Sequence, residues 1–182
     1  ASAFIFASSY VTFTASAQAI GLDASITTLG GDLNNSGDID VAAVADVDVA
    51  LSAYAESNNA FAHISAGNTV YFSAEAQATG LDADIGTLTG DLINSGDITA
   101  QAAANVDVAL LADADTGDAF AYLHSVSSNV TLYATATAYG IFASITTADD
   151  LSNSGALVVD AVATIEVDIT AIAGVAGGAD AY

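Results

Sequence analysis

Apolar and polar residues alternate along three long stretches of the chain. Over residues 39–55 every odd position is apolar, while the even positions include Asp46 and Asp48. The same alternation occupies residues 98–112 and 157–171. A period of two places the apolar side chains on one face of a β-strand, whereas a helix would spread them all around. The pattern therefore predicts strands, although alanine itself is a better helix former than strand former.

A second kind of alternating segment ends each time at a glycine. Apolar residues occupy the even positions from Val70 to Ala78 and resume on odd positions at Leu81, after Gly80. The related segments end at the glycines Gly21 and Gly140. A bulge or a corner would produce this change of phase, and glycine is the residue that permits one.

The chain repeats with a period of 59 residues. The tripeptide Asn-Ser-Gly occurs at positions 35–37, 94–96 and 153–155. The repeats form one repetitive domain with units 1–59, 60–118 and 119–177, and residues 178–182 start a fourth unit. Self-similarity at a fixed period of this length is typical of solenoids and related arrays.

The Asn-Ser-Gly motifs predict turns at equivalent corners, because asparagine and glycine tolerate left-handed backbone angles. The predicted turn residues are Asn35, Gly37, Asn94, Gly96, Asn153 and Gly155. The third unit also has an extra residue within 125–129 and a compensating loss between positions 145 and 151. Because length changes belong in turns, we expect turns there too.

These patterns predict an all-β protein, a parallel β-helix or β-solenoid. Each repeat contains two similar halves, and its longest alternating stretch far exceeds the usual strand of about five or six residues. We therefore expect the strand path to bend around corners, with two rungs per repeat and about six rungs in all. Three rungs per repeat is a variant. The main alternative is a long-stranded antiparallel β-sandwich with strand exchange between subunits.

The charge of the chain narrows the choice of partners. Its 182 residues include 22 acidic residues and no Lys, Arg, Pro or Cys, so the net charge is −22. Nucleic acids and anionic membrane surfaces are poor partners for such a chain. Asp interrupts every apolar run well short of the roughly 18 residues that a spanning helix needs, so we expect no membrane insertion. Without cysteine there are no disulfides or thiolate metal sites.

No cofactor is expected, but calcium is the one that the composition would suit, since carboxylates and turn carbonyls are its preferred ligands. The candidate ligands are the turn carboxylates Asp32, Asp38, Asp91, Asp97 and Asp150. The favoured interpretation of these residues is an acidic solvated face that keeps a fibre soluble. With two rungs per repeat, equivalent carboxylates would lie roughly 10 Å apart. Their repulsion would have to be screened by salt or metal.

Catalytic motifs are absent from the sequence. His63 and His124 are separated by 61 positions, so they are not equivalent in the repeat, and we expect them to be solvent-facing or in turns. No Gly-x-Ser-x-Gly elbow or phosphate-binding loop occurs. We therefore expect that the protein is not an enzyme. A third hypothesis, a flat threonine array that binds ice, fits poorly because the middle repeat has Glu75 and Gln77 on that face.

The repeat unit resembles those of giant bacterial surface proteins. The unit is an apolar residue, any residue, Asn-Ser-Gly, any residue and usually Ile, followed by Ala-x-Ala-x-Ala. The similar proteins include autotransporter-like and haemagglutinin-like β-helical adhesins and filament proteins. This resemblance implies an exported protein with a structural role, located outside the cell or on its surface. It carries no binding residues across to this chain.

The expected function is a structural subunit or repeat section of an extracellular filament, sheath or adhesin stalk. No cap is visible at either end of the repeat pattern, which suggests end-to-end strand stacking on copies of itself or a slice of a longer protein. The alternative is a calcium-dependent adhesin module that binds a ligand or a surface, with cell-surface polysaccharide as a partner. Clustering of Tyr54, Phe61, Tyr71 and Tyr139 on one face would favour that alternative.

Overall fold

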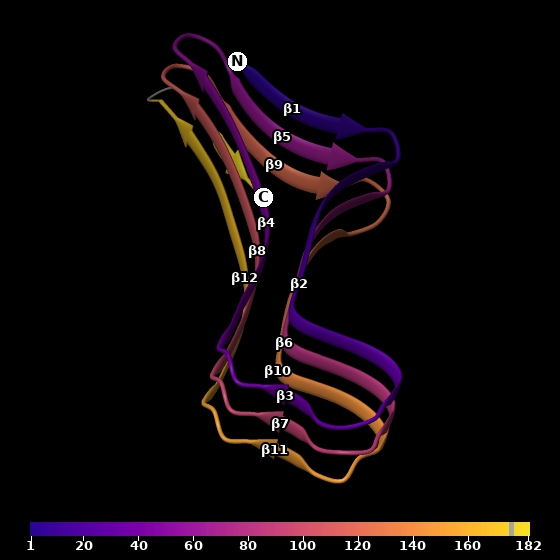
Figure 1. Ribbon diagram of the computed structural model, residues 1–182. Helices are drawn as coiled ribbons and strands as arrows, with labels where there is room; N and C mark the ends of the chain where they lie inside the picture. The colour runs from indigo at the N-terminus through magenta and orange to yellow at the C-terminus, as the bar shows by residue number, and fades with distance from the viewer. Residues whose placement is uncertain (175–176) are drawn as a thin grey trace.

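The computed structural model describes residues 1–174 and 177–182 and consists of parallel strands stacked in coils (Figure 1). The strands are β1 (Ser2–Ala7), β2 (Tyr10–Leu29), β3 (Leu33–Asn35), β4 (Ile39–Ala55), β5 (Ala60–Ala66), β6 (Thr69–Leu88), β7 (Leu92–Asn94), β8 (Ile98–Ala114), β9 (Ala119–Ser125), β10 (Val130–Thr147), β11 (Leu151–Asn153), β12 (Leu157–Ala173) and β13 (Ala179–Ala181). They form four sheets, in the orders β1-β5-β9-β13, β10-β6-β2, β11-β7-β3 and β12-β8-β4. Within the described residues, no helix has the length and apolar character needed to cross a membrane.

Each strand pairs in parallel with its own copy in the next repeat. Ile39 pairs with Ile98, and Ile98 pairs with Leu157, so the offset between neighbours in this sheet is one repeat. The chain therefore completes three coils, and β13 begins a fourth level by pairing with β9. The expected parallel β-solenoid is confirmed, and the antiparallel sandwich is wrong because every pairing described is parallel.

The expected two rungs per repeat, about six in all, are corrected by this register, because one repeat makes one large coil. The two similar halves of a repeat are the two long walls of that coil, and β2 packs against β4 across the interior. The 17 residues of β4 extend over about 56 Å. A strand of this length is stable because its inward side chains are covered by the opposite wall. The result is a stack that is much wider than it is tall.

A narrow waist divides the interior of each coil into two cores (Figure 1). Glycine occupies the waist because the wall opposite leaves no room for a side chain. A Cβ at Gly80 would lie 2.6 Å from the carbonyl oxygen of Gly140 and would overlap the side chain of Ile98. The predicted change of phase is confirmed here. Ala78, at an even position before the glycine, and Leu81, at an odd position after it, are both buried.

The walls of successive coils are staggered, so the two ends of the stack differ. β4 packs against both β2 and β6, whereas β12 packs against β10 in the opposite wall. As a result, the inward side chain of Val47 is 6% exposed, but its counterpart Ile165 in the third coil is 48% exposed. The inward row of β12 is therefore an apolar surface covered on one side only.

The length changes in the third repeat fall outside its strands. β9 pairs with β5 at an offset of 59 (Ala60 with Ala119), β10 pairs with β6 at 60 (Val70 with Val130), and β11 returns to 59. The extra residue lies between β9 and β10 and the loss lies between β10 and β11, as the sequence predicted.

Replacing Gly80 with alanine should destabilise the coil by about 1–3 kcal/mol, since overpacking a closed interior forces the backbone to shift. Gly30→Ala is the matched control, because a Cβ at Gly30 meets nothing within 4 Å. Urea unfolding followed by circular dichroism measures both. Equal stability of the two variants would contradict the closed waist.

Candidate functional site on the corners and outer faces

The asparagines of the Asn-Ser-Gly motifs form a hydrogen-bonded ladder that runs along one corner of the stack. Each Nδ2 donates to the carbonyl of the glycine two residues later and, where another coil follows, to the Oδ1 of the next asparagine. The distances are Asn35 to Gly37 2.8 Å, Asn35 to Asn94 2.7 Å, Asn94 to Gly96 2.7 Å, Asn94 to Asn153 2.6 Å and Asn153 to Gly155 2.9 Å. Asn94, in the middle coil, is only 1% exposed.

Asparagine is used at this corner for its side chain and not for its backbone freedom. The expectation of left-handed asparagines is wrong, since among the described residues only Gly31 has a positive φ, at 133°. The carboxamide both donates and accepts, so identical residues can stack in an unbroken chain of hydrogen bonds. An aspartate could not do this, because an ionised carboxylate only accepts.

The candidate calcium ligands lie at two corners, and three of them, Asp32, Asp38 and Asp97, accept backbone hydrogen bonds from the next coil. Oδ1 of Asp32 accepts a hydrogen bond from the N–H of Asp91 at 3.0 Å, and Oδ1 of Asp38 accepts from the N–H of Asp97 at 3.0 Å. In the last coil, Asp150 instead accepts from its own neighbour, Leu151, at 2.8 Å. These bonds give the carboxylates a structural role that the sequence analysis did not foresee.

The five carboxylates belong to two separate corners and do not converge on one point. Asp32, Asp91 and Asp150 precede the short strands β3, β7 and β11, whereas Asp38 and Asp97 precede β4 and β8. Within the described ranges, no group of three or more His, Asp or Glu residues is arranged to hold a metal ion. Calcium binding at these positions stays a prediction.

Equivalent carboxylates are closer together than the sequence analysis expected. Because one repeat is one coil, their backbones are about 4.8 Å apart and not roughly 10 Å. Since the Coulomb energy varies inversely with distance, the repulsion is about twice as strong. The same register builds an outward acidic row on β4, β8 and β12, where Asp48, Asp107 and Glu166 are paired neighbours.

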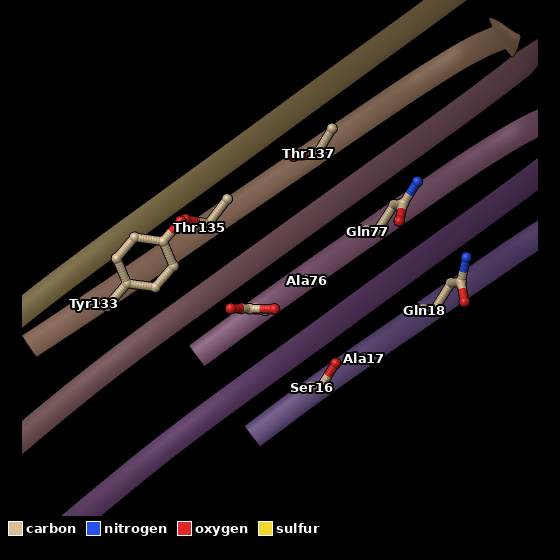
Figure 2. A pocket seen from close by; sticks show the side chains of 9 residues that line it. Ser16, Ala17, Gln18, Ala76, Gln77, Tyr133, Thr135 and Thr137 are labelled. Carbon is tan, nitrogen blue, oxygen red and sulfur yellow. The ribbon is translucent and has the colours of Figure 1, made fainter. Parts of the chain in front are cut away.

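The outer face of β2, β6 and β10 is polar and mixed. A shallow depression on it is lined by side chains from all three strands (Figure 2). Gln18 and Gln77 are register neighbours there, and the next residue in the row is Thr137. Threonine dominates this face only in the third coil, so the flat threonine array of the ice-binding hypothesis is absent from this face.

The outer face of β1, β5 and β9 carries a strip of aromatic rings and both histidines. The phenyl rings of Phe61 and Phe120 are stacked with centroids 5.1 Å apart, and Phe4 lies 6.4 Å beyond Phe61. The four aromatics named in the sequence analysis do not form one patch. Phe61 is in this strip, but Tyr54 lies on β4, Tyr71 on β6 and Tyr139 on β10, in two other sheets.

The histidines are the residues that sequence reasoning missed. Both lie on strands of the outer face, where each is partly exposed, and neither lies in a turn. Nε2 of His63 is 3.0 Å from Nδ1 of His124. His63 pairs in register with Tyr122, and His124 lies two residues further along the same strand. A spacing of one repeat plus two residues places side chains side by side on one face of a parallel sheet, and this was the available clue.

The asparagine ladder makes a graded prediction. Asn94→Ala removes hydrogen bonds to both neighbouring coils and leaves buried partners unsatisfied, so it should cost about 1–3 kcal/mol. Asn35→Ala removes one such bond at a more exposed site and should cost less. Asn105→Ala, on the outer face of β8, is the control and should have little effect. Thermal denaturation compares the three variants, and an Asn94 variant as stable as this control would rule out the ladder.

The stacked carboxylates predict that the melting temperature rises with salt, because the chain has no Lys or Arg to offset them. If the corners bind calcium, millimolar Ca²⁺ should raise it further than NaCl of equal ionic strength, and Asp97→Asn should remove that difference. Asp48→Asn removes the same charge from the outer row and serves as the control. A melting temperature that changes with neither desalting nor chelator would contradict the idea.

Comparison with known proteins gives no relative for this chain: no family model, no curated protein and no solved structure matches it.

Proposed function

We propose that this chain is a structural, non-catalytic section of an extracellular filament, sheath or adhesin stalk that extends by stacking one coil on the next. The observation that carries the proposal is the half-exposed inward row of β12. Val159 and Ile165 are 45% and 48% exposed, whereas their counterparts Ala100 and Val106 in the middle coil are at most 1% exposed. Covering this row is favourable by about 25 cal/mol for each Å² of apolar surface removed from water.

Another coil of the same kind is the occupant that fits this row best. It would continue the parallel pairing of all four sheets without any change of register. At the corner, the second N–H of the Asn153 amide would donate to the Oδ1 of the next asparagine. The Asn94 amide donates to the Oδ1 of Asn153 in the same way. The next coil can come from a further repeat of a longer chain or from another molecule, since the contacts would be the same.

The outer surface suits a fibre that must stay soluble. Acidic side chains point outward from the walls, so lateral contact between stacks meets like charges, whereas the apolar inward rows meet only along the stacking direction. The absence of Lys and Arg also leaves trypsin-like proteases no cleavage site. Both properties, together with the resemblance to bacterial surface proteins, support a location outside the cell or on its surface.

A surface-binding adhesin module has weaker support. The aromatic strip and the exposed pair Tyr139 and Phe142 are the groups of rings that would favour it. In the strip, the rings of Phe61 and Phe120 face each other. Their faces are therefore occupied by neighbouring rings and are not presented to a ligand such as a polysaccharide.

The stacking proposal predicts that the purified chain associates reversibly, and more strongly at high salt. Val159→Lys places an ammonium group within the half-exposed apolar row and should weaken association. Val44→Lys is the matched control, because Val44 points outward and is 62% exposed. Sedimentation velocity over a range of concentrations measures association, and electron micrographs show whether the product is linear.

The expected outcome is concentration-dependent growth for the native chain and the control, and a smaller species for Val159→Lys. Circular dichroism checks that both variants keep their strand content. A native chain that stays monomeric at high concentration and high salt would overturn the proposal, as would equal association of the two variants.

A further inference from the structure

The two histidines form a pair that bridges two coils. His63 lies on β5 and His124 on β9, and their imidazole rings are stacked with centroids 4.8 Å apart and planes 15° apart. Nε2 of His63 and Nδ1 of His124 form a hydrogen bond of 3.0 Å, so one of these two nitrogens carries a proton that a bound metal ion would displace. These are the only two histidines in the chain, so their meeting is not one case of a general histidine-rich surface.

Aromatic neighbours hold the pair in place. Phe4, from the preceding coil, packs edge-on against His63 at 5.8 Å between centroids, and Tyr122 does the same from β9 at 5.7 Å. Beyond Tyr122, the ring of Tyr182 lies 4.4 Å away. Rings packed on both sides restrict the rotation of the His63 imidazole, so its nitrogens keep a defined position relative to His124.

The surroundings of His63 favour its neutral form. Burial lowers the pKa of His63 from its ordinary value, and the proximity of His124 lowers it further. A neutral imidazole has one nitrogen with a free lone pair, which is the form that binds metal ions. The capacity of the pair to bind a metal rests on the positions of its facing nitrogens.

The separation of the two nitrogens matches two ligands of one metal ion. Metal–imidazole bonds are about 2.0–2.1 Å long, so two nitrogens at right angles around a metal lie about 2.9 Å apart, and at a tetrahedral angle about 3.3–3.4 Å. The observed 3.0 Å is close to the right-angle value. Square-planar or tetragonal geometry with nitrogen ligands is typical of Cu(II) and Ni(II).

We propose that His63 and His124 form a surface site for a divalent transition-metal ion, with Cu(II) bound most tightly. Two imidazole nitrogens would take adjacent positions around the metal, and water would take the remaining ones. The preference for Cu(II) follows from the general order of affinities of nitrogen sites for divalent metals. The net charge of −22 attracts cations, and there is no Lys or Arg near the site to repel them.

Bound metal would join β5 to β9 and so fasten the second repeat to the third across the outer face. The site is distinct from the predicted calcium corners in position and in chemistry. It uses nitrogen ligands for a transition metal, whereas the corners offer oxygen ligands. It is also independent of the stacking proposal, because both histidines belong to the same chain.

The test is a titration of the full chain with Cu(II) at pH 7.5 in a non-coordinating buffer, followed by calorimetry and electron paramagnetic resonance. The N-terminal amine is acetylated so that it supplies no competing nitrogen. We expect one Cu(II) per chain and a spectrum with two imidazole nitrogens. His63→Asn and His124→Asn should each weaken binding about 10-fold or more, since losing even an outer-shell partner of a metal typically costs 10- to 100-fold.

Two controls separate this site from general attraction to an acidic surface. Asp107→Asn removes a carboxylate from the outer acidic row, and Tyr122→Phe keeps the ring beside His63, so both should bind Cu(II) as the native chain does. Lowering the pH from 7.5 to 5 should abolish the two-nitrogen spectrum, because protons compete for imidazole. Affinity that is unchanged in both histidine variants, or a spectrum with only oxygen ligands, would overturn the proposal.

Discussion

Parallel pairing between residues one repeat apart is the constraint on which the rest of the structure depends. Each strand has its copy as a hydrogen-bonding neighbour, so each side chain lies beside the same or a similar side chain from the next coil. The register decides what can occupy each position. Residues that interact favourably with themselves are selected, such as asparagine at the corner and phenylalanine on the outer face of β5 and β9. Small alanines fill the interior because the two walls lie close together.

The same register also stacks like charges, which identical neighbours cannot relieve. Two features of the structure reduce the repulsion between stacked carboxylates. At the corners, Asp32 and Asp38 accept backbone hydrogen bonds from the following coil, which gives each carboxylate a favourable contact in the stacking direction. On the walls, Asp48 and Asp107 point into solvent, where water and salt reduce the repulsion. The stability of the stack is therefore coupled to the ionic composition of its surroundings.

Much of the fold could be predicted from the sequence, because a period of two is visible wherever one face of a strand is buried. The change of phase at Gly80 and the turns around the extra residue of the third repeat were predictable for the same reason. The number of coils could not be predicted, because strands usually have about five or six residues and a wall formed by one strand of 17 residues was not expected. The pairing of His63 with His124 was missed as well, since it depends on a diagonal contact that only the coil count reveals.

The one-residue excess before β10 shows how the architecture handles variation in length. The numbering of β10 slips by one against β6, yet residues such as Val70 and Val130 still face each other, and β11 is back in step. The connection between β10 and β11 is one residue shorter, so the offset of one residue is removed before β11, where the original register returns. Successive copies of the unit can therefore diverge by insertion and deletion over evolutionary time without the array losing its continuity.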